Sequence, residues 1–127
     1  MITNRLEDYI EEIYLAKCEK REIKAIDIAN KFGLSRPTIS EALIKLADLD
    51  LIVYKGRKGI AITKKGIIEA RKIIKKHKVL YNFFHKILKI DKKTANDNAC
   101  RIEHVIDDIV IKKIEQIKEQ WLTTLKP

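Results

Sequence analysis

The sequence lacks the features of membrane, secreted and disulfide-rich proteins. Its apolar runs are short and interrupted by charge, so none approaches the roughly 20 apolar residues that cross a bilayer. Residues 1–6 include Asn4 and Arg5 and no apolar block, which argues against a secretory signal. The two cysteines, Cys18 and Cys100, are far apart in the sequence. We therefore expect a cytoplasmic protein with no membrane partner, whose cysteines are reduced thiols.

Glycine is scarce as well, which bears on enzyme chemistry. The four glycines do not form a Gly-rich phosphate loop, and the sequence contains no nucleophile motif, internal repeat or low-complexity segment. A loop that cradles phosphates needs closely spaced glycines so that its backbone can approach the ligand. We therefore expect a binding protein rather than an enzyme.

Positive charge is what the sequence has in excess, and it is unevenly distributed. The net charge is +9, from 27 basic and 18 acidic residues. It is −2 over residues 1–30, +3 over 31–63, +8 over 64–90 and 0 over 91–127. A basic middle favours a polyanionic partner, because binding to phosphates releases counterions. A solvated, lysine-rich surface has the same composition, so charge alone leaves both interpretations open.

The predicted order of elements is helix, helix, turn, helix and hairpin. The spacing of apolar residues predicts helices over 5–20 and 24–32, a third helix that starts after Ser35, and short strands over about 51–54 and 60–63. Gly33 suits the tight turn, because glycine tolerates a positive φ, and the Ser35 side chain can cap the third helix. This order indicates a winged helix-turn-helix; a three-helix bundle with a hairpin is the alternative.

In a winged helix-turn-helix, the first turn of the last helix enters the major groove of DNA. Here that turn is polar: Arg36 can reach phosphate or guanine, and Glu41 can accept a hydrogen bond from cytosine. The Gly-flanked loop between the strands is basic and suits backbone or minor-groove contact. The predicted contacts to double-stranded DNA are Ser35, Arg36, Pro37, Thr38, Ser40, Glu41, Lys55, Arg57 and Lys58.

The remaining half is predicted to be helical, with a long helix over about 64–88 and further helices over 92–106 and 108–122. The long helix would span about 40 Å, and so small a domain can hardly cover its broad apolar face. A second copy of the chain is the natural cover, so we expect a homodimer through residues 64–127. The predicted domains are a DNA-binding head, 1–63, and this helical tail.

Two groups of residues carry metal-binding chemistry. Asp8 and Glu11 share one face of the first helix, and Cys100, Glu103 and His104 share one face of a later helix. Sulfur, carboxylate and imidazole together form a half-site for a divalent transition metal. Each group also has an ordinary alternative: solvated carboxylates in the first case and a small buried thiol in the second. Likewise, a histidine such as His77 on an apolar helix face is more often a core residue than a ligand.

The chain resembles the diphtheria toxin repressor family, which includes iron-dependent regulators and manganese transport regulators. The matching stretches follow the family's order and spacing over nearly the whole chain: EDYIEEIY at 7–14, DIANKFGLSRPTISEALIKLADLDLI at 27–52, YKGRKGIAITKKG at 54–66, KKHKVL at 75–80 and ACRIEHVIDD at 99–108.

The resemblance implies a mostly α fold with a small β-hairpin: a winged helix-turn-helix head followed by a helical metal-binding and dimerisation domain. It also implies a dimeric repressor whose metal, held between head and tail, sets the spacing of the heads for an operator palindrome. Carried over residue by residue, the family's metal site falls on Asp8, Glu11, His77, Cys100, Glu103 and His104.

This implied site is a hybrid. Asp8 and Glu11 resemble the manganese branch, whereas Cys100 resembles the iron branch. Thiolate and imidazole favour Fe(II), Co(II), Ni(II) or Zn(II), and three carboxylates favour Mn(II). We expect Fe(II), with Mn(II) as the close second. The family's ancillary site is missing, because Tyr81 and Asn96 occupy its positions. We also expect no SH3-like domain like that of the iron branch, so that the protein would be a short form of the family.

The resemblance leads us to expect that metal and operator DNA favour the same closed state. Without metal, the carboxylates of Asp8, Glu11 and Glu103 should repel one another and loosen the link between head and tail. The main alternative is a metal-independent winged-helix regulator that senses a small ligand or thiol oxidation at Cys18 or Cys100. Two weaker hypotheses are an enzyme of metal-assisted hydrolysis and a constitutive architectural DNA binder.

Overall fold

The computed structural model describes residues 4–125, with side chains described for residues 5–117. It divides into two compact units, unit 1 (Met1–Lys72) and unit 2 (Ile73–Pro127). The predicted boundary at 63/64 separates a DNA-binding from a metal-binding region, which is a division by function, so it stays a prediction. Residues 1–3 and 126–127 of these predicted domains lie outside the described part. Among the described residues, no helix combines the length and the apolar character that a membrane span requires.

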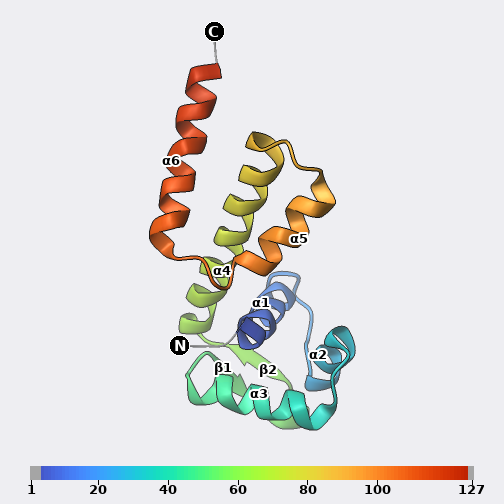
Figure 1. The fold of residues 1–127 in the computed structure, drawn as a ribbon. Helices are drawn as coiled ribbons and strands as arrows, with labels where there is room; N and C mark the ends of the chain where they lie inside the picture. Colours follow the sequence, from blue (N-terminus) through green and yellow to red (C-terminus); the bar gives the residue numbers. More distant parts are fainter. Residues whose placement is uncertain (1–3, 126–127) are drawn as a thin grey trace. The chain divides into compact units, whose positions relative to one another are not determined.

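Unit 1 contains three helices, a hairpin and the first part of a long helix (Figure 1). Its elements are α1 (Asn4–Cys18), α2 (Ala25–Phe32), α3 (Arg36–Asp48), β1 (Ile52–Tyr54), a 3-10 turn (Gly56–Lys58), β2 (Ile60–Ile62) and the start of α4 (Lys64–Asn82). The strands are antiparallel, with Ile52 opposite Ile62 and Tyr54 opposite Ile60. The predicted fold class, mostly helical with a small hairpin, is confirmed.

The turn between α2 and α3 has the geometry that the sequence predicts. Gly33 adopts φ 64° and ψ 38°, the left-handed conformation that glycine adopts without strain, and its N–H bonds to the Ala29 carbonyl. Ser35 caps α3: its Oγ accepts a hydrogen bond from the Thr38 N–H at 3.3 Å, and Pro37 lies in the first turn. This local chemistry fixes where α3 begins.

The core of unit 1 comes from the buried faces of α1, α2, α3 and β1. Its largest fully buried side chains are Ile10, Ile13, Ile28, Ile39, Leu43, Leu46 and Leu51. Burying a Leu or Ile side chain stabilises a fold by about 1.5–3 kcal/mol before the entropy cost of ordering it. These residues therefore hold α3 against the other elements and leave its outer face exposed.

Gly66 marks a close approach in the first turn of α4. A Cβ built at this position would lie 2.1 Å from the Leu51 carbonyl oxygen and 2.7 Å from Ile62 Cγ1. Thr63 holds this contact, since its N–H donates to the Leu51 carbonyl and its Oγ1 accepts from the Gly66 N–H at 3.0 Å. Only glycine fits here, a requirement that the sequence pattern does not predict.

Unit 2 consists of the rest of α4, a π-helical turn (Phe83–Ile87), α5 (Lys92–Ile102) and α6 (Asp108–Leu125). Its buried cluster is small, comprising Leu80, Ala99 and Ile111. Two predicted helices differ from the structure. The α-helical part of the helix predicted over 64–88 ends at Asn82, with a π turn after it, and the helix predicted over 92–106 ends at Ile102.

Candidate metal centre

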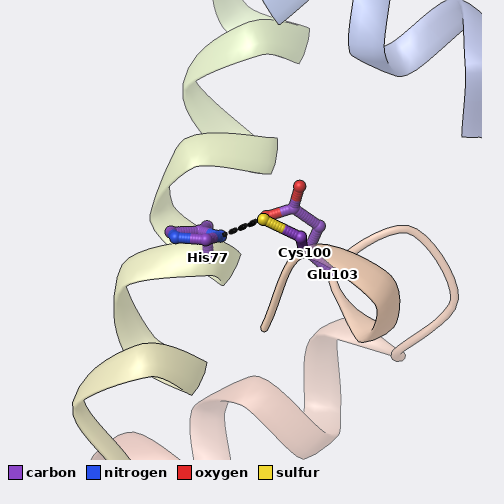
Figure 2. A group of neighbouring side chains, drawn as sticks. All are labelled: His77, Cys100 and Glu103. Carbon is purple, nitrogen blue, oxygen red and sulfur yellow. Dashed lines mark hydrogen bonds and ion pairs between the residues drawn. The ribbon is translucent and has the colours of Figure 1, made fainter. Parts of the chain in front are cut away.

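The second half of α4 and the end of α5 bring three possible metal ligands together in unit 2. His77 comes from α4, Cys100 from the last turn of α5, and Glu103 directly follows that helix. His77 Nδ1 lies 2.9 Å from Glu103 Oε2 and 3.8 Å from Cys100 Sγ. Figure 2 shows the imidazole directing one nitrogen at the sulfur and the carboxylate. The three ligand atoms all lie within 4.8 Å of one another, close enough to bind one ion.

Glu103 links this group to a second histidine. Its Oε2 faces His77 Nδ1, and its Oε1 lies 3.4 Å from His104 Nε2. The carboxylate side chain is only 4% exposed, and Glu103 is the one buried charged residue among those whose side chains are described. A buried carboxylate is costly unless positive charge or hydrogen-bond donors compensate it. Its position between two imidazoles therefore suits a cation site.

Local structure explains how α5 presents these ligands. Asp91 caps the helix, accepting from the Thr94 N–H at 3.0 Å. This backbone hydrogen bond is the main cause that lowers the pKa of the Asp91 carboxyl, followed by the Thr94 side chain. Ala95 and Ala99 are fully buried. Two small residues at i and i+4 form one buried face of α5, and the next residue, Cys100, lies at its exposed edge.

The predicted one-turn arrangement of Cys100, Glu103 and His104 needs a correction. Because α5 ends at Ile102, Glu103 is the C-terminal capping residue and His104 lies in the turn after it. Glu103 keeps right-handed helical angles, φ −54° and ψ −30°, so it still lies near Cys100. The helix is shorter than predicted, yet Cys100 and Glu103 remain close together; the role of these residues as metal ligands stays a prediction.

Four of the six predicted metal ligands lie in unit 2: His77, Cys100, Glu103 and His104. The other two, Asp8 and Glu11, are half-buried residues of α1 in unit 1. A site that joined all six would span both units, and it stays a prediction. Within unit 2 alone, the donors are an imidazole nitrogen, a sulfur and a carboxylate oxygen, a set that fits a divalent transition metal.

Two contacts to His77 lie outside the predicted ligand set. Asn96 Oδ1 is 3.0 Å from His77 Nε2, and the Tyr81 ring is nearly parallel to the imidazole, 8° between planes and 6.5 Å between centroids. Helix spacing could have indicated both, since Asn96 precedes Cys100 by four residues on α5 and Tyr81 follows His77 by four on α4. In the sequence, both positions stood out only as departures from the ancillary site.

The predicted DNA-contact residues lie on the outside of unit 1. In α3, Arg36, Thr38 and Glu41 are exposed and Ser40 is half-buried. The hydroxyls of Ser35 and Thr38 lie 2.8 Å apart and bond to each other, so part of their hydrogen-bonding capacity serves the helix cap. Pro37, Lys55, Arg57 and Lys58 are exposed as well. This exposure is compatible with DNA contact, which stays a prediction for each residue.

Two family models cover most of the chain. Residues 1–60 match the N-terminal DNA-binding domain of the iron-dependent repressors, and residues 63–121 match their metal-binding and dimerisation domain. Among curated relatives, an uncharacterised HTH-type transcriptional regulator of Methanocaldococcus jannaschii is 34% identical, with 94% of this chain and 97% of the relative covered. The HTH-type transcriptional regulator MntR of Bacillus subtilis is 28% identical, with 82% and 72% covered.

Solved structures share the fold. The manganese regulator SloR superposes with a TM-score of 0.78 at 28% identity, over 90% of this chain and 53% of its own, so this chain spans about half its length. A protein of Sulfolobus solfataricus described as hypothetical superposes with a TM-score of 0.77 at 23% identity, over 94% and 91%. The first similarity extends to sequence, whereas the second shows the fold alone.

Proposed function

Because this chain belongs to the iron-dependent repressor family, we propose that it is a transcriptional repressor that binds operator DNA in response to Fe(II) or Mn(II). The family consists of metal-dependent transcriptional regulators, which confirms the prediction of a regulator rather than an enzyme. The observation that carries the proposal is the group formed by His77, Cys100 and Glu103, whose ligand atoms lie within 4.8 Å of one another.

We propose that His77, Cys100, Glu103 and His104 hold the metal from unit 2 and that Asp8 and Glu11 complete the site from unit 1. The Cys100 thiol must lose its proton to bind, and each imidazole must offer a lone pair. A bound divalent ion supplies the positive charge that offsets repulsion among Asp8, Glu11 and Glu103. These carboxylates then hold α1 to the metal-binding helices and so link the DNA-binding head to the tail.

In this proposal, metal and DNA favour the same arrangement of head and tail. Each ligand then tightens binding of the other, since coupling between two sites is reciprocal. A coupling of about 1–3 kcal/mol raises operator affinity roughly 5- to 150-fold. The operator would be double-stranded DNA, and the protein that binds it would be a homodimer. The two copies would contact each other through residues 64–127, of which residues 126–127 lie outside the described part. The DNA contacts would come from the first turn of α3 and from the basic loop between β1 and β2, the wing, which contains Lys55, Arg57 and Lys58.

The metal preference follows from two opposing features of the donor set. Cys100 adds a soft sulfur ligand that favours Fe(II), whereas three carboxylates favour Mn(II). The relative SloR is named a manganese regulator, which supports Mn(II) for the carboxylate-rich part of the site. We place Fe(II) first and Mn(II) second.

The test is anaerobic titration of the purified full chain with Fe(II) and with Mn(II) against a competing chelator. We expect saturable binding that is lost, or changes its order of preference, in Cys100→Ala and His77→Ala. Cys18→Ala is the matched control, since Cys18 is the other exposed thiol and lies in unit 1. Binding no tighter than the chelator background in the unaltered chain would overturn the proposal.

The DNA arm of the test uses sequences selected from a random pool by the metal-loaded protein. We expect the metal to raise affinity for these sequences in the unaltered chain but not in His77→Ala or Cys100→Ala, which should keep only salt-sensitive basal binding. A full metal response in either variant would show that the site is assigned to the wrong residues.

A metal-independent regulator that senses thiol oxidation is the second candidate. One observation favours it: the Cys100 thiol is exposed and lies 3.8 Å from His77 Nδ1, and a nearby imidazole can stabilise a thiolate. DNA binding that responds to peroxide in the unaltered chain, is insensitive in Cys100→Ala and needs no metal would favour this candidate over the first.

A further inference from the structure

The two nitrogens of the His77 ring have different surroundings. Nδ1 faces Glu103 Oε2 at 2.9 Å and Cys100 Sγ at 3.8 Å. Nε2 faces Asn96 Oδ1 at 3.0 Å. Figure 2 shows one nitrogen directed at the sulfur and carboxylate and the other directed away from them. Only Nδ1 therefore belongs to the group of possible metal ligands.

A neutral imidazole has one N–H and one lone pair, and the position of the proton decides which nitrogen can bind a metal. For Nδ1 to bind, the proton must lie on Nε2. Asn96 offers an amide oxygen to Nε2 at hydrogen-bond distance and so favours the proton there. Glu103 offers a carboxylate oxygen to Nδ1 and so favours the opposite tautomer, with the proton on Nδ1. The outer partner therefore influences whether the lone pair faces the ligand group.

We infer that Asn96 is a positioning residue for His77: its Oδ1 accepts the Nε2 proton and so keeps the Nδ1 lone pair directed at Cys100 and Glu103. The inference rests on the proposed metal site and deepens it. Outer hydrogen bonds of this kind fix the tautomer and the ring orientation of metal-binding histidines, and their loss typically weakens metal binding about 10- to 100-fold.

Two features of the fold support this role. First, Asn96 precedes Cys100 by one helical turn on α5, so one helix supplies a partner to each side of the imidazole. Second, the Tyr81 ring, one turn after His77 on α4, is nearly parallel to the imidazole at 8°. A ring parallel to the imidazole favours the observed ring plane, in which Nε2 faces Asn96.

The test compares three single variants with the unaltered chain. Asn96→Ala removes the acceptor, and Asn96→Asp keeps an acceptor oxygen at the same position and makes it stronger. Asn98→Ala is the matched control, because Asn98 lies on the same helix and its Nδ2 bonds within the helix, to the Thr94 carbonyl at 2.8 Å. All three substitutions are on α5 and none replaces a predicted ligand.

The first readout needs no metal. Nitrogen-15 NMR of the His77 ring, at a pH where the ring is neutral, reports the fraction with the proton on Nε2. We expect this fraction to fall in Asn96→Ala, to rise in Asn96→Asp and to stay unchanged in Asn98→Ala. A role for Asn96 in helix stability alone would not produce this order. Equal fractions in all four proteins would overturn the inference.

The second readout is Mn(II) affinity, measured by chelator competition on the full chain. We expect about a 10-fold loss in Asn96→Ala and a recovered affinity in Asn96→Asp. If no protein binds Mn(II), and none binds Fe(II) in the anaerobic titration described above, while the tautomer order holds, the proposed function fails and the positioning of His77 by Asn96 stands. If the unaltered chain binds and Asn96→Ala binds equally tightly, the inference fails and the proposed function stands.

Discussion

Unit 1 and unit 2 differ in how much of their stability a single chain can provide. Of the eight largest fully buried side chains in the described part, seven belong to unit 1, and only Leu80 belongs to unit 2. Unit 2 instead contains the buried carboxylate of Glu103 and exposes Val105 and Ile109 by 67% and 60%. Since buried apolar surface is the main stabilising term, unit 1 has the larger stabilising core.

This difference matches the two tasks that the family models assign to the halves of the chain. If α3 contacts DNA as proposed, the head must present this helix in a fixed orientation, which a dense core provides. We expect a metal-binding and dimerisation half to gain further stability from what it binds. Unit 2 is therefore expected to respond most to metal and to a second copy of the chain, whereas the core of unit 1 around α3 is expected to change little.

The largest expected effect breaks the core of unit 1. Gly66→Ala places a Cβ 2.1 Å from the carbonyl oxygen of Leu51, the residue before β1, so the first turn of α4 must move away from it. We expect the free energy of unfolding to fall by about 3 kcal/mol or more, which is at or above the upper end of the usual cost of overpacking a core. Urea unfolding followed by circular dichroism measures it. Ile68→Ala, on the same helix and 56% exposed, is the control and should stay within about 0.5 kcal/mol.

The next effect sharpens the contrast through metal. Mn(II) at about 100 times its dissociation constant stabilises the state that binds it by about 2.7 kcal/mol. Hydrogen exchange should therefore slow in the helices of unit 2 around His77 and Cys100, and much less around Ile39 in unit 1. Equal slowing throughout both units would show that they unfold together, and the contrast would then be wrong.

The third effect concerns the apolar surface of unit 2. Ile109→Glu places a charge at an exposed position of α6. If that surface lies in the proposed dimer interface, the dissociation constant of the dimer should rise by at least about 10-fold, or 1.4 kcal/mol. Analytical ultracentrifugation measures this change. Ile44→Glu, at a 52% exposed position of α3 in unit 1, is the control. If both variants dimerise as the unaltered chain does, Ile109 lies outside the interface.

A smaller effect tests which unit contacts DNA. Arg57 is exposed in the wing of unit 1, and removing one phosphate contact lowers the slope of log affinity against log salt by about 1. We expect this change in Arg57→Ala, with weaker binding to all sequences. Lys75→Ala in unit 2, which removes an ion pair to Glu115, should leave the slope unchanged. The reverse result would assign the phosphate contacts to the basic part of α4.

The smallest effect is a pH dependence in unit 2. Because its hydrogen bonds to Thr94 lower the pKa of Asp91, this residue stabilises α5 above its ordinary pKa, about 4. That contribution is lost as the pH falls through the lowered pKa. Asp91→Asn keeps an acceptor that does not titrate, so its Tm should fall less steeply than that of the unaltered chain below pH 4. Asp97→Asn, elsewhere on α5, controls for the loss of one negative charge. Parallel curves of Tm against pH for the unaltered chain and both variants would contradict the assignment of the pH dependence to Asp91.

Much of the head was predictable because its signals are local. Gly33 and Ser35 determine the turn and the cap through backbone preferences that act within a few residues. The ends of the tail helices were harder. Nothing in the apolar pattern indicates that α5 stops at Ile102, since the periodicity continues to Ile106. The candidate ligands were found from spacing and resemblance, but the contact between Asn96 and His77 was not.

The sequence by itself determined the order of elements, the turn chemistry and the residue types of the candidate metal ligands, because helix periodicity and capping depend on near neighbours. Only the tertiary structure decided that Gly66 must be glycine, that Glu103 is buried between two imidazoles and that Asn96 reaches His77. These features join residues 15 or more positions apart or depend on burial. Such contacts arise from packing between elements: spacing within one helix can suggest which residues share a face, but not which residue of another helix they reach.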